Sequence, residues 1–112
     1  MRGLRREKYI ANNWRKVALQ VVEIAKRYGN LTKAVVFGDV PLNSIGPYST
    51  IDILLIFDEP CYKITLWDIK IASELGDKSD LVDIKVISKD NEENYLKLIK
   101  DYIVVYPSVL IS

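Results

Sequence analysis

Short apolar runs rich in β-branched residues alternate along this chain with segments whose apolar residues recur every three or four positions. The runs are typical of buried strands and the periodic segments of amphipathic helices. A chain with this alternation buries both kinds of apolar surface by covering a sheet with helices. The predicted strands are 34–37, 51–57, 81–87 and 103–106, and the predicted helices cover about 14–28, 65–75 and 91–102.

The connection between the first two predicted strands decides how they pair. Residues 39–49 include Pro41, Asn43, Gly46 and Pro47, which mark an irregular loop. A parallel crossover needs a dozen or more residues, usually in a helix, so this short loop favours an antiparallel pair. The order α-β-β-α-β-α-β therefore predicts an α/β (α+β) fold with a mixed sheet.

The length of 112 residues fits one domain. We expect a basic flexible N-terminus over 1–11, loose over its first eight residues, then a domain over 12–106 and a tail over 107–112. Asp90 and Glu93 have the spacing of a capping box and would open the last helix. Two tryptophans, Trp14 and Trp67, are interpreted as core or interface anchors.

Composition removes several classes of chemistry. The chain has no histidine, which excludes His-based triads, His-ligated zinc and imidazole acid–base catalysis. Its one cysteine, Cys61, cannot form an internal disulfide and is expected to be a small, partly buried residue. The net charge of +1 gives no global signal for nucleic acid, and no apolar run reaches the length of about 20 residues that spans a bilayer. A cytoplasmic protein that does not enter the membrane is expected.

Two aspartates interrupt otherwise apolar predicted strands. Asp52 and Asp83 would be costly there unless each is paired or bound to a cation. On neighbouring strands they could converge on Mg²⁺, which commonly takes one or two carboxylates together with substrate phosphates. The alternative is that both lie solvated at strand ends or pair with lysines.

The residues around Asp52 carry a resemblance to a known family. Phe37-Gly38-Asp39, ten loop residues and then Thr50-Ile51-Asp52-Ile53-Leu54 resemble the signature of the DNA polymerase beta nucleotidyltransferase superfamily, and especially its minimal nucleotidyltransferases. That signature is an apolar strand, Gly-Ser, a loop and Asp-x-Asp opening the next strand, with a third carboxylate on a later strand. The resemblance covers about residues 12–106.

What the resemblance implies can be assigned residue by residue. Gly38 and Asp39 would lie against the nucleotide, Asp52 and Asp83 would be catalytic, and Thr50, Asp52 and Asp83 would occupy the metal-ligand positions. The implied cofactor is Mg²⁺ and the implied substrate an NTP, whose phosphoryl displacement the metal ions would stabilise.

This sequence departs from the family pattern where it matters for catalysis. Thr50 replaces the first aspartate of the pair, and Asp39 replaces the serine and brings a negative charge to the position of the triphosphate. The usual loop arginines and second glycine are replaced by Val40, Leu42 and Asn43. The alternative is that Asp39 turns inward and supplies the carboxylate that Thr50 lacks.

Two classes of function follow. The first is a catalytically impaired binding protein with an antitoxin-like role, because minimal nucleotidyltransferases resembling this chain often pair with small helical HEPN-type toxins. The second is an active enzyme that moves a nucleoside monophosphate from an NTP to a protein or small-molecule hydroxyl.

Two terminal segments add expectations about partners. The uncharged stretch from Ile103 onward is interpreted as a sheet edge that pairs with another chain, including a second copy in a homodimer, or that packs on its own domain. The N-terminal basic cluster is interpreted as a solvated helix face, with a nucleic-acid footprint as the alternative. Its members are Arg2, Arg5, Arg6, Lys8, Arg15 and Lys16.

Overall fold

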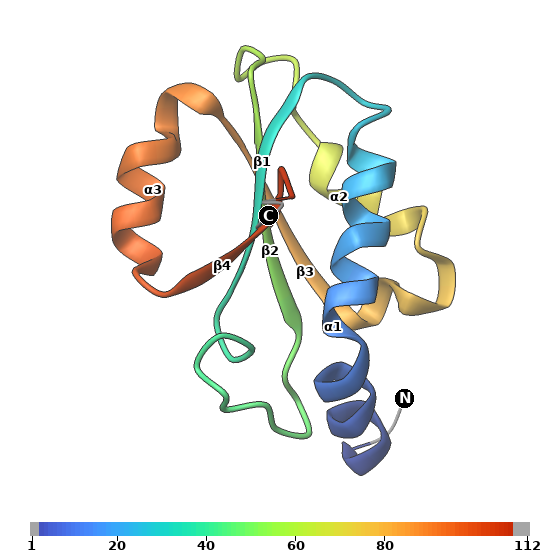
Figure 1. Ribbon diagram of the computed structural model, residues 1–112. Coiled ribbons are helices and arrows are strands. Elements are labelled where there is room, and N and C mark those ends of the chain that lie inside the picture. Colours follow the sequence, from blue (N-terminus) through green and yellow to red (C-terminus); the bar gives the residue numbers. More distant parts are fainter. Residues whose placement is uncertain (1–2, 109–112) are drawn as a thin grey trace.

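Four strands form one mixed sheet in the order β3-β2-β1-β4 (Figure 1). β1 (Leu31–Phe37) pairs antiparallel with both β2 (Ile51–Phe57) and β4 (Tyr102–Tyr106), while β3 (Val82–Ser88) runs parallel to β2. The computed structural model describes residues 3–108. The sheet confirms the predicted fold class, including the antiparallel pair that the short loop requires.

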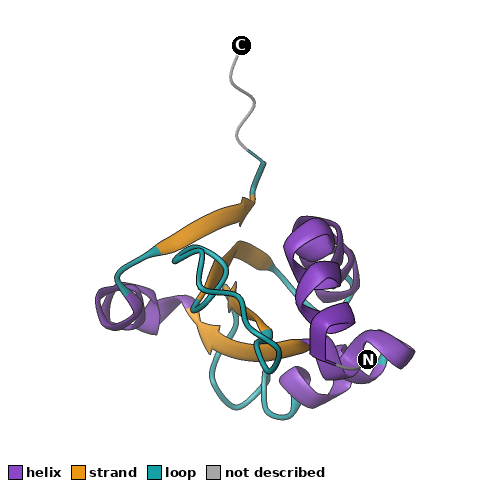
Figure 2. Cartoon of the chain, turned by 90° about the horizontal axis from the view of Figure 1, so that it is seen from below, coloured by secondary structure: helices purple, strands orange, loops and turns teal. Residues whose placement is uncertain are grey.

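Helices cover both faces of this sheet (Figure 2). α1 (Gly3–Ala25) and α2 (Trp67–Ser73) lie on one face, and α3 (Glu92–Ile99) lies on the other. Two short 3-10 helices, η1 (Gly76–Leu81) and η2 (Lys89–Asn91), precede β3 and α3. Within residues 3–108 no helix has both the length and the apolar character needed to cross a membrane.

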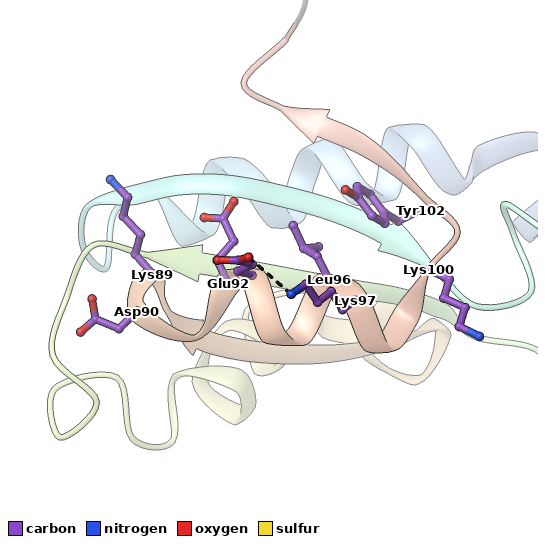
Figure 3. Close-up of a pocket in the computed structure, with 8 residues that line it drawn as sticks. Lys89, Asp90, Glu92, Leu96, Lys97, Lys100 and Tyr102 are labelled. Atoms are coloured by element: carbon purple, nitrogen blue, oxygen red, sulfur yellow. Dashed lines mark ion pairs between the residues drawn. The ribbon is translucent and has the colours of Figure 1, made fainter.

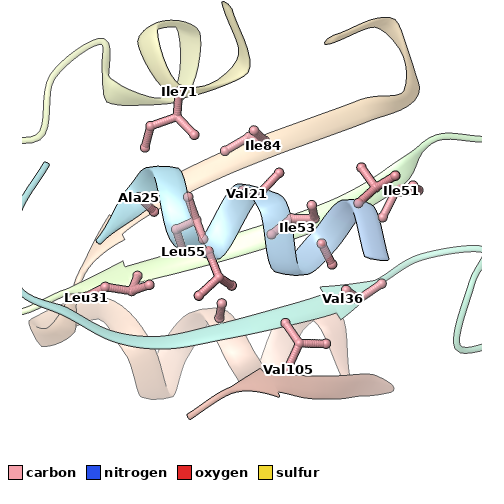
Figure 4. Packing of buried hydrophobic residues seen from close by; sticks show 14 of the residues in the cluster. Val21, Ala25, Leu31, Val36, Ile51, Ile53, Leu55, Ile71, Ile84 and Val105 are labelled. Atoms are coloured by element: carbon pink, nitrogen blue, oxygen red, sulfur yellow. The ribbon is translucent and has the colours of Figure 1, made fainter. Parts of the chain in front are cut away.

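The main core lies between the sheet and the helices α1 and α2 (Figure 4). α1 supplies apolar residues at helical spacing, and the facing strands supply every second residue, as a pleated sheet requires. Each large aliphatic side chain buried here contributes roughly 1.5–3 kcal/mol of transfer free energy. The fully buried members include Val17, Val21, Ala25, Ala34, Val36, Ile53, Leu55 and Phe57.

A smaller core lies on the α3 face. Val35, Leu54 and Ile56 are fully buried there, and Tyr95 and Ile99 of α3 pack against them. Asp52 precedes Leu54 by two residues, so the strand alternation places its side chain on this face as well. The aspartate thus lies at the start of β2, on the side of the sheet that α3 covers.

The start of the chain differs from expectation. α1 begins at Gly3 and continues through the boundary at residue 11 that we predicted for a flexible N-terminus. Ile10 is fully buried in the main core, and this packing stabilises the part of the helix before residue 11. The other predicted boundary, at residue 107, stays a prediction, and most of that tail lies outside the described residues.

Several local predictions are also wrong. Cys61 is exposed rather than partly buried, because it lies in the turn after β2. The capping box does not form: the residue before α3 is Asn91, and no side chain caps that end. α3 ends at Ile99 because Lys100 takes a positive φ of 59°, and Tyr102 already belongs to β4.

Trp67 is a core residue as predicted, packed edge-on to Phe57 with ring centroids 4.9 Å apart.

Candidate functional site

Asp52 and Asp83 are direct partners in the register of the parallel strands β2 and β3. In-register residues of neighbouring strands point to the same face, so both side chains lie on the α3 face at the starts of their strands. Ile84 confirms this alternation, since it packs into the core on the opposite face. The two aspartates that the sequence singled out are therefore brought together.

Gly38 lies against Asp52, and a side chain at this position would have to displace the Asp52 carboxylate. Phe37, at the end of β1, is the register partner of Asp52, and Gly38 follows with a positive φ of 76°. A Cβ atom on Gly38 would lie 2.1 Å from Asp52 Oδ2. The glycine thus provides both the left-handed conformation and the space that the Asp52 carboxylate occupies.

Hydrogen bonds fix Thr50 and Asp39, two of the positions that depart from the pattern of the resembled family. Thr50 Oγ1 donates to Asp52 Oδ1 at 2.6 Å, so the hydroxyl stands beside the carboxylate instead of adding a second one. Asp39 Oδ2 accepts a hydrogen bond of 2.7 Å from Ser49 Oγ, whose oxygen accepts one from the Gly46 N–H at 2.8 Å. Asp39 is therefore held by its own loop.

The charge on Asp52 is disfavoured in this setting. Burial is the largest cause and raises the pKa of Asp52 above its ordinary value, and the negative charges of Asp83 and Asp39 raise it further. The hydrogen bond from Thr50 and the positive charge of Lys85 act in the opposite direction. A bound cation would relieve this cost, because it would offset the charges of the neighbouring carboxylates.

The donor set offers two carboxylates for a divalent cation, which is too few for a two-metal site. Asp52 and Asp83 supply the carboxylate oxygens that Mg²⁺ prefers, and a substrate phosphate commonly completes such a site. Within residues 3–108, however, no three His, Cys, Asp or Glu side chains lie together as a metal-binding group. Thr50 offers only a neutral hydroxyl where a further charged ligand would be needed.

A separate groove lies on the α3 face, between α3 and the start of β4 (Figure 3). Its volume is about 650 Å³, and lysines and carboxylates alternate on its wall, including the pair Lys97–Glu93 with 3.5 Å between Nζ and Oε1. The lining includes Tyr102, which pairs with Phe37 across β1 and β4. The mixed charges give this groove no preference for an anionic ligand.

Two residues of the site were missed by sequence reasoning. Lys85 lies two residues after Asp83, and the strand period of two therefore places both on one face, which was a usable signal. Ser49 is buried and carries the hydrogen bond that holds Asp39, but nothing in a Pro- and Gly-containing loop distinguishes Ser49 from the other serine, Ser44.

Comparison with solved structures identifies this arrangement of strands and helices. The chain is similar to a proposed nucleotidyltransferase from Sulfolobus solfataricus, with a TM-score of 0.55 and 18% identity over 90% of this chain and 83% of the other. It is also similar to a chain from a toxin–antitoxin structure with AMP-PNP, with a TM-score of 0.58 and 14% identity over 81% and 73% of the two chains. No protein-family model and no curated relative matches the sequence. The protein thus has a nucleotidyltransferase-like fold.

Proposed function

We propose that this protein is a minimal nucleotidyltransferase-like protein with an impaired catalytic centre, which acts by binding a protein partner in an antitoxin-like role. The observation that carries the proposal is the hydrogen bond from Thr50 to Asp52, where the family pattern has a second carboxylate. A hydroxyl donor on Asp52 partly satisfies the buried charge and adds no charge of its own for a metal ion. Metal-assisted transfer depends on that charge.

The loop that follows Gly38 supports the same proposal. Residues 39–49 contain no Lys or Arg that could bind a triphosphate, and Asp39 would repel one. The loop instead exposes large side chains, with Leu42 58% and Tyr48 94% accessible. Exposed aromatic and aliphatic residues of this kind are suited to contact with another protein.

The proposed partner is a small helical protein of the HEPN type. The support is the similarity in fold to a chain from a toxin–antitoxin structure, together with the exposed loop residues just described. A homodimer is the alternative assembly. It would use β4, which forms one edge of the sheet and exposes Tyr102 and Val104.

A second candidate function keeps the site active. Asp52 and Asp83 are in register, and burial beside other carboxylates raises the pKa of Asp52, so cation binding would be favourable. A cation held there would offset negative charge on a transferring phosphoryl group. In this case the protein would move a nucleoside monophosphate from an NTP to a hydroxyl group, using Mg²⁺.

Nucleotide binding and transfer separate the two candidates. We expect calorimetry with Mg²⁺ and AMP-PNP to show little binding, and labelled NTPs with Mg²⁺ or Mn²⁺ to leave the protein and the added partner unlabelled. The double variant Thr50→Asp with Asp39→Ser should bind Mg²⁺–AMP-PNP more tightly, because it adds a metal ligand and removes a repulsive charge. Adding Asp52→Asn to this double variant is the matched control and should remove the gain. Robust labelling by the wild type that Asp52→Asn abolishes would establish the active enzyme instead.

Light scattering tests the assembly. The full chain should form a complex or a dimer, and a version ending at Tyr106 should associate less, because it lacks the apolar residues that follow the edge strand. A stable monomer at all concentrations, alone and mixed with the candidate partner, would contradict the binding role.

A further inference from the structure

The N-terminal turns of α1 extend past the end of the sheet, beside loop 39–49 and the starts of β2 and β3 (Figure 1). Arg6 lies in this part of the helix, and its side chain is only 12% exposed. Its Nε donates a hydrogen bond of 2.9 Å to the Ser49 carbonyl oxygen, and its Nη2 donates one of 2.7 Å to the Asp80 carbonyl oxygen. Nη1 lies 3.5 Å from Asp80 Oδ2.

The two carbonyl groups that Arg6 binds occupy equivalent places. Ser49 precedes Asp52 by three residues, Asp80 precedes Asp83 by three residues, and the two aspartates are register partners. One guanidinium group therefore joins the two chain segments that lead into the candidate carboxylates. Its donors have a fixed planar geometry, so binding both carbonyls fixes the distance between the segments.

The same contact extends to the loop. Ser49, whose carbonyl accepts from Arg6, uses its hydroxyl to hold Asp39. Arg6 thus contacts the segments that position Asp39, Asp52 and Asp83. It does so although it is 43 positions from Ser49 and 74 from Asp80 in the sequence. Its burial and its two backbone acceptors leave the guanidinium poorly placed to contact a nucleic-acid phosphate.

We infer that Arg6 is a positioning residue, which sets the spacing of Asp52 and Asp83 by binding the main chain in front of both strands. This inference goes beyond the proposed function, because the spacing depends on Arg6 whether or not the site is catalytic. It also means that the first turns of α1 are part of the site and that a change there alters it.

The test compares variants of two arginines near opposite ends of α1. Arg6→Gln and Arg6→Lys are set against Arg27→Gln, which removes an exposed ion pair with Glu74 (2.8 Å between Nη2 and Oε1) in the turn just after the end of α1. Amide hydrogen exchange and cross-strand NOEs are measured on the full chain. The amides of 50–53 and 82–84 report on the site, and those in the middle of β1 report on the rest of the sheet.

We expect Arg6→Gln to speed exchange at the starts of β2 and β3 about tenfold relative to the middle of β1, because local opening no longer breaks charge-assisted bonds. The cross-strand NOEs between Asp52 and β3 should weaken in the same variant. Arg6→Lys should fall between wild type and Arg6→Gln, since an ammonium keeps the charge but lacks the planar fork. Arg27→Gln should leave both strand starts unchanged.

Two outcomes would overturn the inference. One is unchanged exchange and NOEs at both strand starts in Arg6→Gln, and the other is a uniform change across the sheet, which means a general structural role. If Arg6→Gln does not fold, Arg6→Lys decides by the same local comparison. None of these measurements uses a nucleotide or a partner, so their result is independent of the proposed function.

Discussion

A carboxylate lies at each end of the parallel strand pair β2–β3, Asp52 at the start and Glu59 just past the end of β2, and the pKa values of the two are shifted in opposite directions. At the start, Asp52 lies beside Asp83, and its pKa is raised, first by burial. Just past the end of β2, Glu59 accepts a hydrogen bond of 2.9 Å from the Asn30 N–H and pairs with Lys63 at 2.9 Å. The pKa of Glu59 is lowered, first by the backbone hydrogen bond from Asn30.

Glu59 has a backbone N–H and a lysine as partners that stabilise its charge, whereas Asp52, among the described residues, has only the hydrogen bond from Thr50 and the more distant charge of Lys85 against its burial. Glu59 helps to connect segments, since its carbonyl oxygen also accepts a hydrogen bond of 2.8 Å from Ser88 Oγ at the end of β3. Its charge is used for stability. A charge held at a cost, as on Asp52, is typical of a residue kept for binding a ligand or cation.

Replacement of Gly38 should have the largest effect. Gly38→Ala should destabilise the protein by about 2–4 kcal/mol. The new Cβ would overlap the Asp52 carboxylate, and the alanine would have to keep the positive φ of Gly38. Gly76→Ala is the matched control: Gly76 also has a positive φ, of 61°, but open space around it. It should cost only about 1 kcal/mol of backbone strain. Equal losses for the two variants in urea denaturation would show that the contact with Asp52 is not tight.

Neutralising Glu59 should have an intermediate effect. Glu59→Gln should lower the Tm at pH 7, because it removes the ion pair with Lys63 and weakens the hydrogen bond from Asn30. A lowered pKa in the folded state contributes stability above the ordinary value of about 4.5, and this contribution is lost as the pH falls through the folded value. The Tm difference between wild type and variant should therefore shrink below pH 4.5. A difference that stays constant down to pH 3 would exclude the charge as its cause.

Neutralising Asp52 should have the smallest effect and the opposite sign. Asp52→Asn keeps an oxygen that can accept from Thr50 and removes the buried charge, so it should stabilise the protein by roughly 0.5 kcal/mol at pH 7. A raised pKa in the folded state favours folding below the ordinary value of about 3.8, and this benefit is lost as the pH rises through the folded value. The gain should thus vanish below about pH 3.8. A loss of stability at pH 7 would place Asp52 with Glu59 as a structural carboxylate.

The sequence predicted those parts of the fold whose signals are local. β2 was predicted with its observed bounds because a loop rich in Pro and Gly precedes it and Asp58-Glu59-Pro60 follows it. The start of α1 was not predicted, because residues 3–8 are mostly polar. Part of the order there comes from contacts of Arg6 with residues far away in the sequence.

The candidate site was predictable to the same extent. The isolation of Asp52 and Asp83 in apolar strands indicated that they would meet, and the strand register agrees. The hydrogen bonds of Thr50 and Ser49 depend on side-chain orientation in a loop, and residue types alone do not determine it. The same holds for the irregularity in the β1–β4 register between Ala34 and Val35, which the residue types of the two strands do not indicate.

The pairing of β4 with β1 has a consequence during synthesis of the chain. β1 can pair with β2 soon after β2 has been translated. The other edge of β1 stays unpaired until β4, about 65 residues later, has left the ribosome. The nascent chain therefore carries a hydrophobic strand with one unpaired side until β4 is available to pair with it. Such a strand is a binding site for chaperones and a risk for aggregation, and slow translation just before β4 would lengthen the exposure.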